Sequence, residues 1–369
     1  MLRAAAYLLG ALVVTTLVHG YLHRRLIRDT DLPRAYGALV LAIAALLPAG
    51  MAGLLDMHDL PRAVARPLMA CAFLWVGVLL FLLPLLGIGE AARALPASPA
   101  RRRALARIVA LASGAGALAL SGASVAIARL PPRVRRVRVP LAGLARPYRL
   151  VQISDLHVSA AHGDDLVAEL VRMIDGLAPD LVAVTGDLVD GSVRELGARV
   201  AALGRARAKD GVFFVTGNHE ALSGVDEWVA FLRDLGVRVL RNEHVRLACG
   251  VDLVGVDDSS CGGDLDAAVR GRDRARPSVL LAHRPDDVRR AAEHGVALQI
   301  SGHTHGGQIA PLGWALERVH QPYVYGLHRV GETLLYVTSG AGLWGPPMRL
   351  ATRAEIVLFD LVPEGPRGG

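Results

Sequence analysis

Five short blocks of the sequence carry side chains that bind divalent metal ions. The blocks are Asp155-Leu-His157, Gly186-Asp187-Leu-Val-Asp190, Gly217-Asn218-His219-Glu220, the single His283, and Gly302-His303-Thr304-His305. Together their carboxylate, amide and imidazole groups suit Mn, Fe, Zn, Co or Ni better than Ca or Mg, which prefer oxygen ligands alone. The seven candidate metal ligands are Asp155, His157, Asp187, Asn218, His283, His303 and His305. Seven ligands are too many for one tetrahedral ion and fit two ions sharing a carboxylate, typically about 3.5–4 Å apart.

The five metal-capable blocks each follow an apolar stretch with the length of a buried strand. Predicted strands cover 149–154, 181–185, 212–216, 251–256, 278–282, 296–300 and 334–338, with further strands at 133–139 and 351–362. Helical periodicity covers 164–177, 193–208, 225–235 and 286–294. Strands that alternate with helices predict an α/β layered fold. Because the carboxyl ends of parallel strands share one edge of a sheet, residues far apart in sequence can meet there.

The local spacing of the ligands also favours a common site. In Asp155-x-His157 and His303-x-His305, an extended pair two residues apart would point both side chains to the same side. A glycine directly precedes each of Asp187, Asn218 and His303, and we expect these glycines to permit tight turns and unusual φ angles close to the ions. These glycines are Gly186, Gly217 and Gly302.

The ordered blocks resemble the calcineurin-like metallophosphoesterase superfamily over roughly residues 134–362. The longer motif Gly-His-Thr-His-Gly-Gly-Gln at 302–308, together with the Ser-Gly, Pro-Pro-Met-Arg and Glu-Ile segments within 339–356, is similar to the YkuE and YaeI-like branch. That branch includes membrane-attached bacterial phosphohydrolases. The resemblance implies a layered β-sandwich flanked by helices, and hydrolysis of a phosphate ester or pyrophosphate by metal-activated hydroxide.

The resemblance implies a role for each matching residue. One metal would be held by Asp155, His157 and His305, the second by Asn218, His283 and His303, with Asp187 bridging both. His219 would stand beside the ions as a catalytic group that stabilises the phosphate oxygen or protonates the leaving alkoxide. Asp190 and Glu220 would orient the ligand histidines or His219. Since no ligand position departs from the pattern, we expect an active enzyme.

The N-terminal third of the chain is a different kind of sequence. Uncharged, mostly apolar runs predict four transmembrane helices at about 4–22, 35–55, 67–89 and 108–128, each near the roughly 20 residues that cross a bilayer. The alternatives are a buried helical core, which would keep a polar face that 67–89 lacks, and for the first run a signal peptide, which no clear cleavage pattern supports. We therefore expect an all-α membrane region over 1–130, a catalytic domain over 131–362 and a disordered tail over 363–369.

Charge separates the same two regions. Residues 1–149 hold 19 Arg and 5 acidic residues, whereas residues 150–369 hold 22 Lys and Arg and 29 acidic residues. The basic part suits anionic lipid headgroups, and the acidic catalytic part gives no support for nucleic-acid binding. Short predicted loops one and three hold nine Arg, against three in the N-terminus and loop two. The four Arg residues of 133–138 count the other way and nearly balance this difference, but we assign them to a strand of the folded domain. The positive-inside rule then puts the catalytic domain outside the cytoplasm of a multi-pass membrane protein.

Several assignments stay open on sequence alone. The substrate is a phosphorylated small molecule or lipid, and the alternative function is a membrane sensor that holds a phosphorylated ligand on its metal pair. Asp257 and Asp258 end a strand, but we expect them outside the full ligand set. We expect the late aromatic residues, which follow the last metal block, to pack a covering loop. The alternative is that they, or Arg349, contact the substrate. Cys249 and Cys261 could pair or stay as thiols. The late aromatic residues are Trp314, Tyr323, Tyr325 and Trp344.

Overall fold

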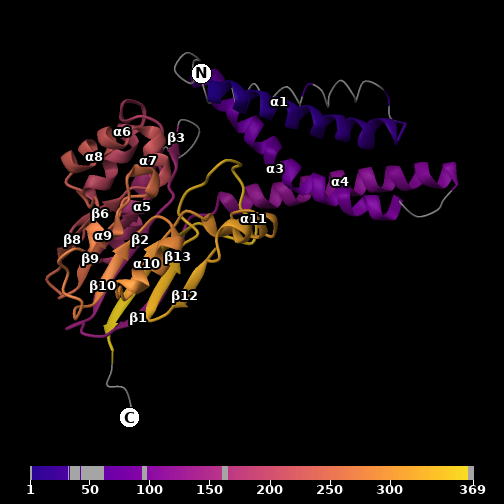
Figure 1. Ribbon diagram of the computed structural model, residues 1–369. Coiled ribbons are helices and arrows are strands. Elements are labelled where there is room, and N and C mark those ends of the chain that lie inside the picture. The colour runs from indigo at the N-terminus through magenta and orange to yellow at the C-terminus, as the bar shows by residue number, and fades with distance from the viewer. Residues whose placement is uncertain are drawn as a thin grey trace, which may run out of the picture. The chain divides into compact units, whose positions relative to one another are not determined.

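The chain forms two units in a computed structural model that describes residues 2–31, 33, 42, 62–93, 98–159 and 165–364 (Figure 1). One unit comprises Met1–Ile127 with Gly345–Met348, and the other comprises Ala128–Trp344 with Arg349–Gly369. The first is helical and the second contains all the described strands.

The helical unit contains long apolar helices. The helices are α1 (Leu2–His23), followed by a short π-helical turn, α3 (Arg62–Arg93) and α4 (Pro99–Ala128). Among the described helices, two segments are long and apolar enough to cross a membrane, Pro67–Ala91 and Pro99–Ala128. The structure thus supports two of the four predicted spans. The first predicted span is helical in α1, and the second, 35–55, lies outside the described residues apart from residue 42.

Polar contacts join α1 to α3. The indole Nε1 of Trp75 donates to His19 Nε2 at 2.9 Å. Arg25, in the turn after α1, forms an ion pair with Glu90 of α3 at 2.6 Å. Glu90 lies at the very end of the apolar segment Pro67–Ala91, where a charged group can keep contact with water.

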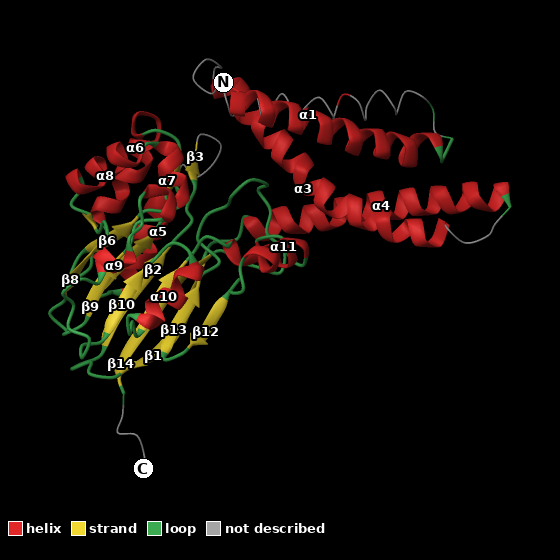
Figure 2. Cartoon of the chain, viewed as in Figure 1, coloured by secondary structure: helices red, strands yellow, loops and turns green. Residues whose placement is uncertain are grey.

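The second unit corresponds to the predicted catalytic domain and is therefore called the catalytic unit. It contains two six-stranded sheets, which Figure 2 shows in yellow. In order across the first sheet, the strands are β1 (Arg133–Leu141), β14 (Glu355–Pro363), β2 (Tyr148–Ile153), β4 (Leu181–Thr185), β6 (Val212–Val215) and β7 (Arg238–Val239). Across the second they are β12 (Gly326–Val330), β13 (Thr333–Val337), β11 (Leu298–Ser301), β10 (Ser278–Leu281), β9 (Asp252–Gly255) and β8 (Glu243–Arg246). Strands β2, β4 and β6 are parallel, as are β9, β10, β11 and β13.

The sheets pack face to face and helices cover their outer faces. Leu150 and Phe213 of the first sheet and Val279 and Leu298 of the second belong to one buried cluster between the sheets. Helices α5 (Leu166–Leu177), α6 (Val193–Val200) and α8 (Val225–Asp234) cover the first sheet, while α9 (Leu265–Ala268) and α10 (Val288–Glu293) cover the second. Burial on both faces explains why the central strands are uninterrupted apolar runs without alternation.

The predicted α/β layers are confirmed, with differences at the edges. All nine predicted strands are present within a few residues, and the regular Arg–Val alternation of 133–139 does form β1, paired in parallel with β14. The helix predicted over 193–208 ends earlier, at Val200, and continues as a 3₁₀ turn over Ala201–Arg205. The sequence did not indicate α7 (Asn218–Ser223), α11 (Leu312–His320) or the short edge strands, whose patterns are too brief to show a period.

Candidate metal centre

The carboxyl ends of five strands bring the predicted ligands together. Strands β2, β4 and β6 supply them from the first sheet, and β10 and β11 from the second. Three overlapping groups of side chains could hold a metal ion, with ligand atoms within 4.8 Å of one another: Asp155, His157 and His305; His157, Asp187 and His219; and Asp187, His283 and His303. His157 and Asp187 each belong to two groups, so the groups form one continuous cluster.

The distances between these atoms match those around a bound ion. His157 Nε2 lies 3.0 Å from His305 Nε2, and His283 Nε2 lies 3.2 Å from both His303 Nδ1 and Asp187 Oδ2. Nitrogen and oxygen ligands about 2.0–2.2 Å from one ion stand roughly 3–3.5 Å from each other. The donor set therefore fits divalent metal ions.

Two buried oxygens of the predicted ligands lack a partner. Asn218 Oδ1 and Asp155 Oδ2 are buried and have no hydrogen-bond partner within the described parts of the chain. Leaving such an oxygen buried and unpaired costs about 1–3 kcal/mol. A cation bound at the cluster would satisfy both atoms, which is an independent reason to regard it as a metal centre.

The backbone at the centre adopts left-handed conformations. The φ angles are 54° at Asp155, 46° at His157, 51° at Asp187, 72° at His303 and 51° at His305. The prediction of extended pairs was therefore wrong, because the chain turns sharply as soon as each strand ends. The turn separates His303 from His305, so that they belong to different groups. Such conformations are unfavourable for residues with a Cβ atom and commonly occur where a site demands them.

The three glycines have two different roles. Gly186 has φ 85°, as predicted. Gly217 and Gly302 do not have a positive φ, so that part of the prediction was wrong. They provide space instead: a Cβ atom on Gly217 would lie 2.2 Å from Asp187 Oδ1, and one on Gly302 would lie 2.2 Å from Asp155 Oδ2.

Asp190 connects two histidines of the centre. Its Oδ1 lies 3.0 Å from His157 Nδ1 and 2.6 Å from His219 Nδ1. The rings of the two histidines meet edge to face, with centroids 4.6 Å apart. A carboxylate at Nδ1 leaves Nε2 of each ring pointing the other way. Asp190 thus orients both imidazoles without touching the group to which they point.

Glu220 supports the backbone of the centre and not a histidine. Its two carboxylate oxygens accept hydrogen bonds from the backbone N–H groups of Asp187, Leu188 and Gly217, at 3.0, 2.8 and 2.6 Å. The predicted contact of Glu220 with a histidine is therefore replaced by a clamp that joins the turns after β4 and β6. This clamp holds the backbone of Asp187 and Asn218 in register.

The electrostatics of the chain alone separate the histidines into two kinds. Burial and the neighbouring His283 lower the pKa of His303 to about 3. Burial and His157 also lower the pKa of His305, so both rings are neutral at pH 7 and keep a lone pair for a metal. Burial opposes the charge of His283, but Asp187 and Asp155 raise its pKa to about 10. A metal ion would take the place of that proton.

Arg284 is a site residue that the sequence reasoning missed. Its Nε donates to Asp258 Oδ2 at 2.7 Å, and its Nη1 lies 3.4 Å from His303 Nε2. The guanidinium group is thus fixed at one end and stands beside the metal centre with donors to spare. Its position directly after the predicted ligand His283 was the only feature of the sequence that could have indicated a place in the site.

Trp344 is the late aromatic residue at the centre. Its ring centroid lies 6.0 Å from that of His219, and its side chain is 55% exposed. The Gln308 side chain accepts from Trp344 N at 3.2 Å and donates to Trp344 O at 2.9 Å. These two bonds fix the backbone that carries the indole.

The remaining candidates make other contacts. Asp257 accepts from Thr216 and Arg241, and Asp258 from Ser260 and Arg284, as expected of residues outside the ligand set. Arg349 is fully buried and donates to the carbonyl oxygens of Ser339, Gly340 and Gly342, so it supports a loop. Trp314 stacks on Arg318, Tyr325 donates to Glu355, and Tyr323 packs in a small core. Cys249 and Cys261 are unpaired.

The fold and the cluster define an α/β protein with a candidate metal centre at the strand ends of its two sheets. The chain belongs to the calcineurin-like phosphoesterase family, whose profile matches residues 148–307. A metallophosphoesterase of Helicobacter pylori is 32% identical over 80% of this chain and 81% of its own. A bovine "Transmembrane protein with metallophosphoesterase domain" is 38% identical over 63% of this chain and 57% of its own. The metallophosphoesterase YkuE of Bacillus subtilis is 30% identical over 58% and 79%.

Proposed function

We propose that this protein is a membrane-attached phosphohydrolase that uses two divalent metal ions. The carrying observation is that six of the seven ligand candidates and His219 converge from five strand ends, while the buried side-chain oxygen of the seventh candidate, Asn218, has no partner among the described residues. Asp155, His157 and His305 form the set for one ion. Asn218, His283 and His303 form the set for the other, and Asp187 is shared. When bound, such a pair neutralises phosphoryl oxygens and supplies a nucleophile near neutral pH.

His219 and Asp190 supply the proton chemistry in this proposal. Asp190 holds His219 through Nδ1, so the opposite nitrogen, Nε2, is directed away from the carboxylate. From Nε2 the ring can donate a proton to the departing ester oxygen, or stabilise a phosphoryl oxygen. His219 is therefore the catalytic residue, and Asp190 is a positioning residue that also orients His157.

Turnover by the purified full chain tests the proposal. After chelation, we expect hydrolysis of an aryl phosphomonoester or diester to return with Mn²⁺ or another transition-metal ion. Asn218→Ala should abolish activity and lower the bound metal measured by mass spectrometry. Asn242→Ala is the matched control, since Asn242 bonds to Gly262 and to backbone N–H groups outside the centre. Activity that survives both chelation and Asn218→Ala would refute the proposal.

A binding protein that holds a phosphorylated ligand on its metals is the second candidate. The Asp190–His219 pair favours the enzyme, because binding alone does not need an oriented proton donor. The two proposals predict different results for one sample. A protein that binds two metals and inorganic phosphate but turns over none of the aryl esters would be the sensor.

Attachment to the membrane rests on α3 and α4 and on a relative. Both helices have a segment long and apolar enough to cross a bilayer, and the bovine relative is named a transmembrane protein. The Arg distribution around the predicted spans favours a catalytic domain outside the cytoplasm. A phosphatase reporter fused after Gly369 should be active in that compartment. A reporter active only in the cytoplasm would reverse the proposed orientation.

A further inference from the structure

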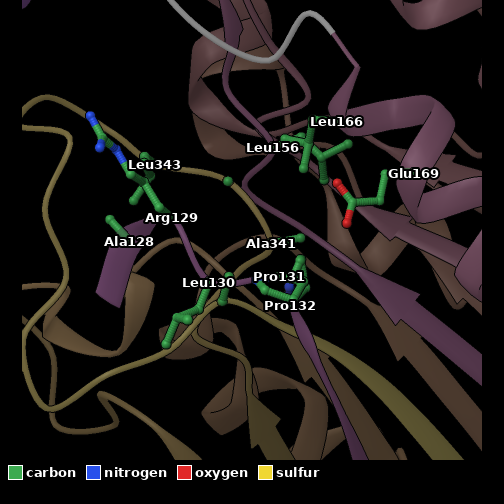
Figure 3. A pocket seen from close by; sticks show the side chains of 12 residues that line it. Ala128, Arg129, Leu130, Pro131, Pro132, Leu156, Leu166, Glu169, Ala341 and Leu343 are labelled. Atoms are coloured by element: carbon green, nitrogen blue, oxygen red, sulfur yellow. The ribbon is translucent and has the colours of Figure 1, made fainter. Parts of the chain in front are cut away.

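An apolar pocket lies in the catalytic unit (Figure 3), apart from the metal ligands. Its volume is about 390 Å³, within the range of roughly 300–1,000 Å³ of small-molecule sites. Nine of its twelve lining residues are Ala, Leu or Pro. The apolar lining residues are Ala128, Leu130, Pro131, Pro132, Leu156, Leu166, Ala341, Leu343 and Ala354. The two charged ones, Arg129 and Glu169, lie on opposite sides in Figure 3.

The pocket begins where the last candidate membrane span ends. Ala128 is the final residue of α4, and it lines the pocket together with the next four residues. This continuity is covalent, so it holds wherever the catalytic unit lies relative to the helices. If α4 crosses a bilayer, the pocket wall starts at the bilayer surface. The exposed Arg129 in this wall can keep its charge in water while its stem stays on apolar surface.

The pocket also adjoins the metal centre through two turns of the chain. Leu156 lines the pocket and lies between the ligand candidates Asp155 and His157. Leu343 lines the pocket, and the next residue, Trp344, has its ring 6.0 Å from that of His219. Neighbouring Cα atoms are about 3.8 Å apart. A molecule with its phosphate at the centre therefore has an apolar wall within reach of its ester chain.

We propose that this pocket binds the hydrocarbon chain of an amphiphilic phosphoester whose phosphate occupies the metal centre. The inference rests on the proposed phosphohydrolase function and narrows its substrate to a lipid-like class. The occupant is argued from the apolar lining and from the covalent continuity with α4. A water-soluble sugar phosphate or nucleotide would gain nothing from nine apolar side chains.

Chain length is the variable that tests this assignment. Primary alkyl esters share one leaving-group chemistry, so lengthening the chain changes burial and leaves the reacting atoms alone. Each methylene that enters the pocket should raise kcat/KM up to about fourfold. We expect kcat/KM to rise from ethyl through hexyl to octyl phosphate and then level off as the pocket fills. The enzyme is the full chain in lipid nanodiscs, with esters kept below their aggregation limit.

Variants of the wall separate the pocket from the bulk bilayer. Leu343→Asn and Leu130→Asn should flatten the rise of kcat/KM with chain length. Leu327→Asn is the matched control, since Leu327 is 48% exposed on β12 and does not line the pocket. If kcat/KM rises equally steeply with chain length in the wild type and in both pocket variants, the inference is overturned, because uptake of the ester by the bilayer would then explain the rise.

Two results distinguish this inference from the proposed function. If aryl and alkyl esters are hydrolysed without any dependence on chain length, the pocket assignment is wrong, while the proposed phosphohydrolase function stands. If no ester is turned over, the phosphohydrolase fails, and calorimetric binding of octyl phosphonate to the metal-loaded chain still tests the pocket. Octyl phosphonate should bind more tightly than ethyl phosphonate to the wild type, and Leu343→Asn should remove the difference. Equal binding of both phosphonates by the wild type overturns the inference.

Discussion

At the residue scale, Asp190 joins a ligand candidate and a proton donor through one carboxylate. Its Oδ1 is within 3.0 Å of Nδ1 on both His157 and His219. Burial opposes its negative charge, yet His157 and His219 bring the pKa of Asp190 well below its ordinary value, so it is ionised at neutral pH. An ionised acceptor fixes the same ring nitrogen in both histidines. The Nε2 atoms of the two imidazoles therefore point away from Asp190 and remain available to a metal ion or a substrate.

His219→Ala should reveal general acid catalysis through the leaving group. With an alkyl phosphate the departing alkoxide needs a proton, and we expect kcat to fall about 100- to 10,000-fold. With p-nitrophenyl phosphate the leaving group is stable as an anion, so the loss should be much smaller. Steady-state kinetics on both substrates measure the ratio. His328→Ala serves as control, because His328 contacts the Tyr325 carbonyl. Equal losses on the two substrates would exclude a proton-donating role.

Arg284→Gln should weaken binding of the phosphoryl group. The guanidinium is anchored on Asp258 and stands beside His303, so its free donors can reach a non-bridging oxygen. Losing a charge-assisted hydrogen bond of about 1.5–3 kcal/mol raises KM roughly 10- to 100-fold. Arg284→Lys should recover only part, since ammonium lacks the planar fork. Arg290→Gln is a matched control that removes an exposed pair with Asp266. An unchanged KM in Arg284→Gln would contradict the assignment.

At the element scale, the turns after the strands determine the site, and Gly217 tests this. A Cβ atom there would lie 2.2 Å from Asp187 Oδ1 and 2.5 Å from Asp187 N. Because backbone must move, we expect Gly217→Ala to lower stability by about 1–3 kcal/mol and to reduce metal content. Thermal unfolding and metal analysis measure both. In the control Gly176→Ala, an added Cβ meets nothing within 4 Å in α5, so stability should hold or rise. Full metal content in Gly217→Ala would contradict the close-packing argument.

Asp287, just before α10, should make stability depend on pH. Burial, helped by the charges of Asp286 and Asp258, raises its pKa to about 6. A carboxyl with a raised folded-state pKa contributes stability below its unfolded value, near 4, and loses that contribution as pH rises through about 6. Asp287→Asn should therefore gain stability relative to the wild type between pH 4 and pH 7. Chemical unfolding at both pH values gives the difference, and a pH-independent difference would contradict it.

The strand positions were predictable from the sequence, as were most of the side chains that meet at the strand ends, but the geometry that joins them was not. Apolar runs such as 181–185 predict a buried strand by composition alone, and the types of the residues that follow them predict metal ligands. The left-handed turns at Asp155 and His303 depend on how both sheets meet, which no local pattern encodes. Arg284 gained its role from Asp258, a residue on another turn. Glu220 likewise contacts backbone groups whose positions only the fold defines.

At the scale of the whole molecule, the charge boundary and the structural boundary lie near each other but do not coincide. The helical unit contains the basic part only up to Ile127, and the sheets contain the acidic part together with the Arg-rich strand β1. The sheets enclose a core of their own, and all seven ligand candidates lie between residues 155 and 305. The site is thus assembled entirely from the catalytic unit. The pocket residues Arg129–Pro132 follow α4 directly in the chain.

A fragment covering 131–369 should separate catalysis from attachment. The full chain should remain in the membrane pellet after an alkaline wash, because its apolar helices cannot leave the bilayer without exposing their side chains to water. The fragment should appear in the soluble fraction and hydrolyse an aryl phosphate at a rate comparable to that of the full chain, since it retains every ligand candidate. Its preference for octyl over ethyl phosphate should weaken, because it lacks Ala128, Arg129 and Leu130 of the pocket wall. Extraction of the full chain by the wash would contradict membrane spanning, and a fragment that folds but binds no metal would contradict a self-contained centre.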